Sequence, residues 1–237
     1  MAVLSVLAIG SHPDDVELGC AGALLAHRAA RHRTAMLVMT GGEQSRNYSE
    51  KRRLVEQEAA TECLGAELFW GGFLDCEIPS DRTTINRIEQ VMEEVRPDLI
   101  YVHAPDDAHQ DHRTVAAAAV SAARRTARIL FYQSPSTTRF EPSIFIDVKH
   151  HLGTKLAALE CHESQIDAES VQLDAVAASA RHWGAIARIP LAEAFVPVRF
   201  VWDITADEQS PRAAERPRRL VQPSHSSHGT AGFTSAE

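Results

Sequence analysis

Two short stretches of the sequence combine residue types that bind divalent metals and transfer protons. The first, residues 11–17, reads Ser-His-Pro-Asp-Asp-Val-Glu and directly follows an apolar run that closes on Gly10. The second, residues 104–112, reads Ala-Pro-Asp-Asp-Ala-His-Gln-Asp-His. Imidazole and carboxylate groups suit zinc and similar metals. Either stretch alone is also typical of a solvated loop or a helix cap, so a metal site requires the fold to bring both together.

The order of the expected elements predicts that the two stretches meet. Apolar runs predict strands at 3–9, 35–40, 67–70, 99–103 and 129–132. Helical patterns lie between them, at about 18–31, 49–64, 84–95 and 112–125, and Gly65 suits the C-terminal cap of the second helix. Strands alternating with helices at this spacing predict an α/β fold, a Rossmann-like, doubly wound three-layer sandwich with a mostly parallel sheet.

The common strand order 3-2-1-4-5 would make the first and fourth strands neighbours. The chain then winds away from them in opposite directions and opens a crevice above their carboxyl ends. Each of the two stretches follows one of these strands. We therefore expect both at one crevice, although about a hundred residues separate them.

The later part of the chain has a weaker pattern. We expect a strand at 144–148, a helix at 149–161, a loop closing over the molecule at 185–197 and an extended segment at 195–204. From residue 206 onward the chain is rich in Pro, Arg, Ser, His and Gly, without apolar periodicity. Such a segment cannot bury enough apolar surface to offset its ordering entropy. The sequence thus predicts a single domain at 1–205 and a flexible, disordered C-terminal tail at 206–237.

Composition excludes several classes of protein. The net charge of -8 over 237 residues comes without a basic stripe, which argues against nucleic acid or an anionic membrane as partner. No apolar run approaches 18 residues, and the opening residues lack a basic segment and a cleavage site, so we expect a cytoplasmic protein. The four cysteines form no CxxC pair and are expected to be free thiols. The oligomeric state stays open, a homo-oligomer included.

The spacing of the first stretch favours a metal site with a proton acceptor beside it. His12 and Asp15 are three residues apart with Pro13 fixing φ between them, so both side chains can reach one cation while Asp14 points elsewhere. A histidine of the second stretch would complete the three protein ligands of a catalytic zinc site, which leaves one position for water. Asp14 would then take a proton from that water and deliver it to a leaving amine. The same donors also suit Fe2+ or Co2+.

Both stretches resemble motifs of a known family. The turn HPDDVELGCAGALL and the loop HQDHRTV are similar to those of the PIG-L/LmbE-like zinc-dependent deacetylases, which remove acetyl from N-acetylglucosamine-type sugars. Weaker matches at 40–43, 75 and 193–195 extend the resemblance over about residues 3–200. It implies a hydrolase that removes an N-acetyl group from an N-acetylglucosamine-type sugar or glycoconjugate through a zinc-bound water. The expected partner is a small amino-sugar substrate.

Carried over residue by residue, the resemblance implies three sets of roles. The zinc ligands would be His12, Asp15 and His112. The catalytic residues would be Asp14 as general base, His109 as support for the oxyanion, and Asp111 as the orienting partner of His109. The substrate contacts would be Arg53, Asp75 and Glu43.

Each of these interpretations has a rival. Two histidines and one carboxylate also describe non-haem iron(II) enzymes, although those sites usually sit on β-barrels. A non-catalytic α/β binding module is a further alternative, but Gly10-Ser11-His12 is no GxGxxG loop and adjacent carboxylates repel a pyrophosphate. Arg53 can equally be a solvated helix-face residue, and Asp75 and Glu43 can be loop caps.

Overall fold

The computed structural model describes residues 3–45 and 50–203; the tail predicted at 206–237 lies outside them. The strands are β1 (Ser5–Gly10), β2 (Arg33–Thr40), β3 (Glu67–Phe73), β4 (Leu99–His103), β5 (Arg128–Tyr132), β6 (Ile144–Asp147) and β7 (Ala192–Phe200). The helices are α1 (Asp15–Ala29), α2 (Glu50–Leu64), α3 (Arg82–Val95), α4 (Gln110–Ala122), α5 (Leu152–Glu160), α6 (Glu163–Asp167) and α7 (Leu173–Ala187).

These strands form one mixed sheet in the order β3-β2-β1-β4-β5-β7-β6. The strands β1 to β5 run parallel, whereas β7 is antiparallel to both β5 and β6. The predicted α/β class, the mostly parallel sheet and the 3-2-1-4-5 order are therefore confirmed. Because β1 and β4 are neighbours, the loops that follow them open at the same edge of the sheet.

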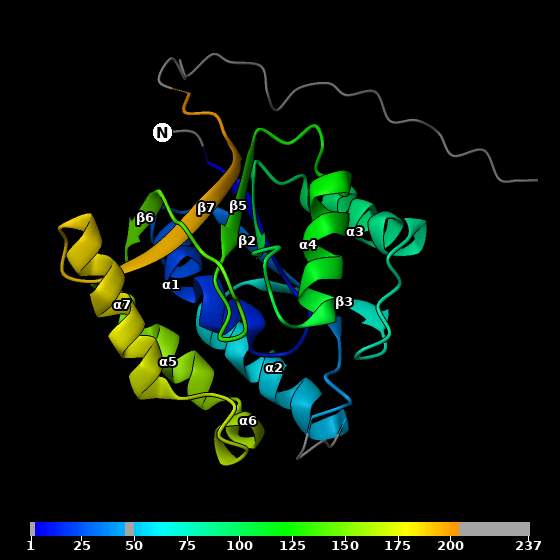
Figure 1. The fold of residues 1–237 in the computed structure, drawn as a ribbon, viewed down its shortest axis with the longest axis horizontal. Coiled ribbons are helices and arrows are strands. Elements are labelled where there is room, and N and C mark those ends of the chain that lie inside the picture. Colours follow the sequence, from blue (N-terminus) through cyan, green and yellow to red (C-terminus); the bar gives the residue numbers. More distant parts are fainter. Residues whose placement is uncertain (1–2, 46–49, 204–237) are drawn as a thin grey trace, which may run out of the picture. The chain divides into compact units, whose positions relative to one another are not determined.

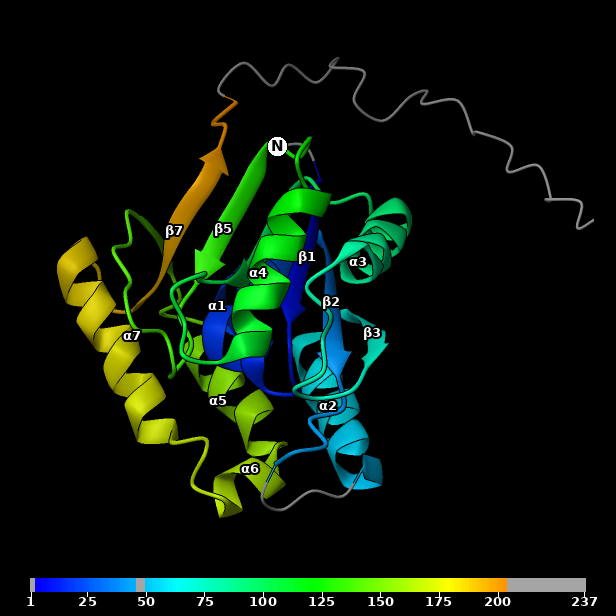
Figure 2. The same ribbon diagram turned by 45° about the vertical axis from the view of Figure 1, so that its right-hand side comes forward.

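Helices cover both faces of the sheet, with α3 and α4 on one side and α1, α2, α5 and α7 on the other (Figure 1, Figure 2). Leu24 of α1 and Leu64 of α2 pack with Val6 in one buried cluster. Ile88 of α3 and Val115 of α4 belong to a second cluster on the opposite face. Successive side chains of β1 alternate between these two clusters, which is why its run is apolar throughout.

Glycines are required at two positions, one after α2 and one within α1. Gly65 ends α2 at φ 61°, as expected for a left-handed cap. Gly19 lies in α1 where a Cβ atom would stand 2.1 Å from the Tyr132 ring, so only glycine lets the helix approach β5 this closely. Gly19 thereby lets α1 pack directly against the Tyr132 ring.

The later part of the chain departs from the expectations. The loop predicted at 185–197 is wrong, because this range contains the end of α7 and the first six of the nine residues of β7. The sequence pattern does not predict the helices α6 and α7. The extended segment predicted at 195–204 corresponds to the second half of β7, whose pairing begins three residues earlier. Within the described residues, no helix has the length and hydropathy needed to cross a membrane.

Candidate active site

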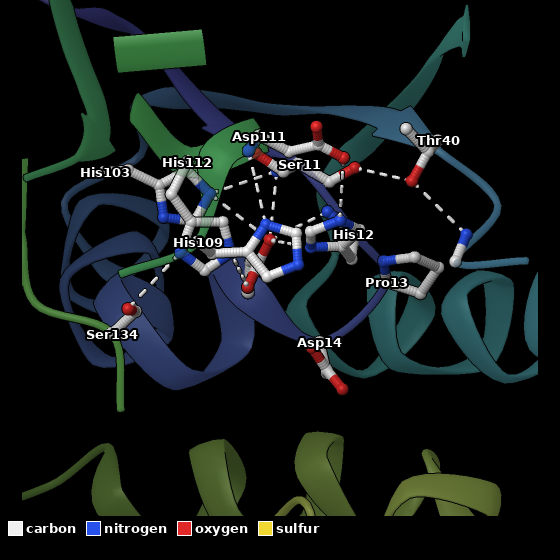
Figure 3. A network of polar contacts seen from close by, with 12 residues as sticks. Ser11, His12, Pro13, Asp14, Thr40, His103, His109, Asp111, His112 and Ser134 are labelled. Atoms are coloured by element: carbon white, nitrogen blue, oxygen red, sulfur yellow. Dashed lines mark hydrogen bonds and ion pairs between the residues drawn. The ribbon is translucent and has the colours of Figure 1, made fainter. Parts of the chain in front are cut away.

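The turn between β1 and α1 is held in an unusual backbone conformation. Asp14 occupies the N-cap position of α1 at φ 95°, in the left-handed region, and its side chain makes no capping hydrogen bond. Asp14 thus stands at the cap position of the first stretch without making the side-chain hydrogen bond of a helix cap. Strain of this kind persists only where the surroundings impose it. Its consequence is visible in Figure 3, where the Asp14 side chain points away from the histidines.

Asp15 closes the same turn from the other side. Its buried carboxylate accepts hydrogen bonds through Oδ2 from the backbone N–H groups of His12, at 2.7 Å, and Ser11, at 3.0 Å. These contacts fix the carboxylate at the sheet edge, beneath the histidines that arrive from β4 and α4. Burial alone would raise the pKa of Asp15, but His112 and His103 outweigh it and hold that pKa well below its usual range.

Two histidines from distant loops meet at this carboxylate. His12 Nδ1 lies 3.3 Å from Asp15 Oδ2, and His112 Nε2 lies 3.4 Å from Asp15 Oδ1. His112 enters from the first turn of α4, and its ring centroid is 5.4 Å from that of His12. The residues named from the sequence as metal ligands are thus brought to one point, with the two carboxylate oxygens of Asp15 shared between the imidazoles.

The outer nitrogen of each imidazole faces further carboxylates. His12 Nε2 lies 3.0 Å from Asp75 Oδ1 and 3.3 Å from Asp111 Oδ2. His112 Nδ1 lies 3.2 Å from Asp107 Oδ1. Carboxylates in this position fix the tautomer of a ligating histidine and raise its basicity. For each ring, the nitrogen that faces Asp15 is then the one left free to bind a cation.

Asp107 is itself held by a ring of donors. Its carboxylate accepts from the hydroxyls of Ser134 at 2.6 Å, Ser136 at 2.6 Å and Thr137 at 3.0 Å, and from the backbone N–H of His109 at 2.8 Å. The loop after β5 therefore supports the loop after β4. Sequence reasoning missed Asp107; the signal was its position beside the histidine motif, in a run of two aspartates.

This donor set fits a divalent cation. When the outer nitrogen of a neutral imidazole carries the proton, its inner nitrogen presents a lone pair to an Asp15 oxygen. The inner nitrogens of His12 and His112 lie 3.3 and 3.4 Å from these oxygens. At this distance the nitrogen and oxygen lone pairs repel unless a proton or a metal ion lies between them. Burial lowers the pKa of His12, but its contacts with Asp111, Asp15 and Asp75 outweigh burial and raise it well above its usual value. A positive charge is therefore needed here, and a metal can supply it in place of the proton.

His103 is a fourth imidazole of the cluster, which sequence reasoning did not single out. It is the last residue of β4, fully buried, and its ring stacks on His112 with centroids 3.9 Å apart. His103 Nε2 lies 3.2 Å from Asp15 Oδ2, and Asp15, His103 and His112 form one group with ligand atoms within 4.8 Å of one another. Burial lowers the pKa of His103 to about 4, which keeps it neutral. Its position at the end of β4, beside the crevice between β1 and β4, is the sequence feature that could have identified His103.

His109 caps α4 and stands at the rim of the cluster. Its Nδ1 accepts from the backbone N–H of Asp111 at 3.2 Å, which leaves Nε2 to carry the proton. Burial and the neighbouring His12 and His112 lower the pKa of His109, so the ring is neutral. Asp111, the predicted orienting partner of His109, meets that ring through its backbone N–H and not through its carboxylate. The carboxylate of Asp111 instead faces His12 and accepts from the backbone N–H of Cys76 at 2.8 Å, because the first turn of α4 points it inward.

Arg53 lies against the turn and is not a solvated helix-face residue. It is 3 % exposed, donates to the carbonyl of Pro13 at 2.5 Å, and stands 3.6 Å from Asp14 Oδ2. Gln57, one turn further along α2, accepts from the Asp14 backbone N–H at 3.3 Å. Burial raises the pKa of Asp14 to about 6, although the charge of Arg53 opposes this. Asp14 is thus ionised at neutral pH yet more basic than an ordinary carboxylate.

The two acidic residues predicted to contact substrate brace the surrounding loops. Glu43 accepts from the backbone N–H groups of Gly41 at 3.2 Å and Asp75 at 2.9 Å. Asp75 accepts from the N–H of Gln44 at 3.0 Å while its other oxygen faces His12. Both carboxylates thus accept hydrogen bonds from loop backbone N–H groups, as loop caps do. Asp75 in addition contacts His12 of the histidine cluster.

Comparison with known proteins identifies the family to which the chain belongs. The family model for PIG-L, GlcNAc-PI de-N-acetylase, matches residues 7–123, a range that holds both motifs. The uncharacterized deacetylase YaiS of Escherichia coli strain K12 is 34% identical over 170 residues, covering 67% of this chain and 90% of that protein. The chain belongs to the PIG-L family of deacetylases.

Two further similar proteins were found in the comparisons. The diacetylchitobiose deacetylase of Thermococcus kodakarensis is 26% identical over 188 residues, covering 69% of this chain and 70% of that protein. Among solved structures, the conserved protein TT1542 of Thermus thermophilus has a TM-score of 0.78 and 26% identity, with 86% of this chain and 99% of that chain covered. The PIG-L family is thus shown by sequence, and the fold by structural similarity.

Proposed function

We propose that this chain is a metal-dependent hydrolase that removes the N-acetyl group from an N-acetylglucosamine-type sugar or glycoconjugate. One observation carries the proposal: the inner nitrogens of His12 and His112 both face the Asp15 carboxylate, while their outer nitrogens face other carboxylates. Membership of a deacetylase family supports the reaction class over an iron oxygenase or a non-catalytic binding module.

The proposed metal ligands are His12, Asp15 and His112, with zinc as the expected ion and Fe2+ or Co2+ as ions that suit the same donors. When bound, such an ion supplies Lewis acidity to the amide carbonyl and makes a water molecule more acidic. Asp107, Asp75 and Asp111 hold the two imidazoles in the required orientation through the contacts described above. The site then needs little rearrangement to bind the ion.

Asp14 is the proposed general base. Within the described chain its carboxylate contacts no histidine of the cluster and instead faces Arg53, so it remains available to accept a proton from the attacking water. The same group then returns the proton to the nitrogen of the leaving amine. Burial keeps the Asp14 carboxylate basic enough for both steps, while Arg53 and Gln57 hold the turn that carries it.

His109 is the proposed donor to the oxyanion that develops on the amide oxygen. Its Nδ1 is engaged by the Asp111 backbone N–H, so its Nε2–H is available to donate. One such donor contributes about 3 kcal/mol to lowering the barrier. Arg53 is the proposed contact to a sugar hydroxyl, since its Nε lacks a hydrogen-bond partner among the described residues. Asp75 and Glu43 would act on the substrate through the loop that they brace.

Acetate release from N-acetylglucosamine and its conjugates tests the proposal directly. Activity should disappear with a chelator and return when zinc is added back. The Asp14→Asn variant should retain the metal, measured by elemental analysis, and lose at least about a hundredfold in turnover, because the base is removed while the ligands stay. An Asp14→Asn variant with wild-type turnover would remove this residue as the base. A protein that binds no divalent metal after supplementation would overturn the scheme.

A further inference from the structure

We infer that Glu17 is a positioning residue for Asp14, the proposed general base, and that it acts through the side chain of Gln57. The inference rests on the proposed function, in which Asp14 transfers the protons. Glu17 lies in the first turn of α1 and Gln57 lies in α2, and both are fully buried. The two helices therefore share a polar contact beside the turn that carries Asp14.

The backbone of Asp14 needs support from outside its own turn. Asp14 is a non-glycine residue at φ 95°, a conformation that persists only where the surrounding structure imposes it. Its side chain makes no capping hydrogen bond, but its backbone N–H donates to Gln57 Oε1 at 3.3 Å. The direction in which the Asp14 carboxylate leaves the turn, away from the histidines in Figure 3, thus depends on a contact with α2.

An acceptor must face the Asp14 N–H, and the other partners of the Gln57 amide ensure that it does. Gln57 Nε2 donates to Glu17 Oε1 at 2.7 Å and to Thr61 Oγ1 at 3.2 Å. The Thr61 hydroxyl donates its own proton to the Gln57 carbonyl at 2.7 Å, and an ionised carboxylate only accepts. Both partners on this side therefore require the NH2 group of the amide, which leaves the amide oxygen of Gln57 for Asp14.

His162 supplies the opposite charge that a buried carboxylate needs. Its side chain is fully buried, and Nε2 lies 3.6 Å from Glu17 Oε1, a contact between charges and not a hydrogen bond. Burial lowers the pKa of His162, but the contact with Glu17 and the charge of Asp14 outweigh burial and raise that pKa. The imidazole is therefore protonated more readily than usual and balances the Glu17 carboxylate.

Stability alone does not account for this buried ion pair. Apolar side chains of similar volume often fill such a place at no cost in stability, whereas a buried carboxylate fixes the direction of its hydrogen bonds. Here the direction that is fixed is that of the Gln57 amide, and Asp14 lies at the other end of that amide. Glu17 therefore serves the reaction and not only the fold.

An exchange of the two side chains tests the positioning role. In Glu17→Gln the new side chain can donate as well as accept, so nothing directs the Gln57 oxygen toward Asp14. In Gln57→Glu two buried carboxylates meet at the contact between α1 and α2 and repel each other. The double variant has an amide at position 17 and a carboxylate at position 57. That amide can donate to the carboxylate, whose second oxygen accepts from the Asp14 N–H.

The kinetics of N-acetylglucosamine deacetylation by the zinc-loaded protein measure the effect. We expect kcat to fall about ten- to a hundredfold in each single variant, because the base is displaced from its productive position. In the double variant kcat should return to within about threefold of the wild-type value. KM and zinc affinity should change less than about twofold, since neither residue is a proposed metal ligand or substrate contact.

Glu56→Gln is the matched control. Glu56 precedes Gln57 in α2 and is also buried, but its carboxylate accepts from the Ser164 backbone N–H at 2.9 Å and from the Ser164 hydroxyl at 2.6 Å. The same chemical change there leaves the contact between Gln57 and Glu17 in place, so kcat should stay within about twofold of the wild-type value. Equal losses of kcat in Glu56→Gln and Glu17→Gln would refute the specific role of Glu17.

Two further results would overturn the positioning role. One is a wild-type kcat in Glu17→Gln, with folding verified by circular dichroism. The other is a double variant that folds but turns over no faster than the single variants. If Glu17→Gln alone does not fold, the comparison between the double variant and Gln57→Glu decides.

Amide hydrogen exchange separates this inference from the proposed function. The Asp14 N–H, followed by NMR, should exchange about tenfold faster in Glu17→Gln than in the wild type, and at nearly the wild-type rate in the double variant. That result without acetate release from any sugar would support the hold of Glu17 on Asp14 and reject the deacetylase. Acetate release by the wild type, with kcat and amide exchange both unchanged in Glu17→Gln, would reject the inference alone.

Discussion

Replacing Asp107 by Asn tests whether His112 is oriented in advance for a metal. The carboxylate lies 3.2 Å from His112 Nδ1 and accepts four hydrogen bonds, three of them from hydroxyls that can rotate to accept from an amide. Asn fills the same space, so the fold should persist while the negative charge behind the imidazole is lost. Loss of such a partner typically weakens metal binding about 10–100-fold, which corresponds to about 1.4–2.7 kcal/mol.

The assay is competition for zinc with a chromogenic chelator at pH 7.5, performed on the wild type, Asp107→Asn and Asp106→Asn. Asp106 is the neighbouring aspartate and is exposed, so it controls for the loss of one charge in the same loop. We expect Asp106→Asn to bind zinc within about twofold of the wild type, because the exposed charge is screened. Equal zinc affinities for the wild type and Asp107→Asn would refute the role given to the Asp107–His112 contact.

Two further predictions concern stability. His27 packs between His32 and Tyr101, at 2.8 and 2.9 Å, and burial followed by the charge of His32 lowers its pKa to about 4. The unfolded chain binds the His27 proton more tightly than the folded chain does. Neutral His27 therefore contributes stability above pH 6.5, and this contribution is lost as the pH falls toward 4. Urea unfolding at pH 7 and 4.5 should show a loss of about 2–3 kcal/mol in the wild type that His27→Gln lacks. Lys155→Met should lower the free energy of unfolding by about 3–5 kcal/mol, since it strands the buried Glu193 carboxylate. Arg139→Met, at an exposed ion pair with Glu141, should cost less than about 1 kcal/mol, and equal losses in the two variants would contradict this account.

The sequence was informative where local pattern and topology agree. The strands β1, β2, β4 and β5 are largely buried apolar runs, and β3 is a partly buried one. Helices of ordinary length connect them, so the parallel order and the meeting of the two loops followed from the crossover rule. The same logic placed His12, Asp15 and His112 at one edge of the sheet before any distance was known. Their residue types also suggested the chemistry.

Local pattern was less informative after residue 132. Strand β7 pairs with both β5 and β6, and its register shifts between Ile129 and Leu130, where Pro197 lies opposite. A proline interrupts the sequence pattern of a strand, and it is tolerated here because Pro197 lies at this irregularity and beyond residues 192–195, where β6 pairs with β7. Helix α7 was missed because only Ala180 and Gly184 of it are buried, so it lacks a broad apolar stripe.

The sequence by itself determined the order of the elements up to residue 132 and the identity of the two loops that carry metal-binding residue types, because strand and helix periodicity depend on neighbours close in the chain. The tertiary structure decided how those groups are supported. Asp107 reaches His112 only because the loop after β5 folds back on it, and His103 joins the cluster only because β4 ends beneath α4. Contacts of this kind join residues that no local pattern links, since burial and packing between distant segments select them.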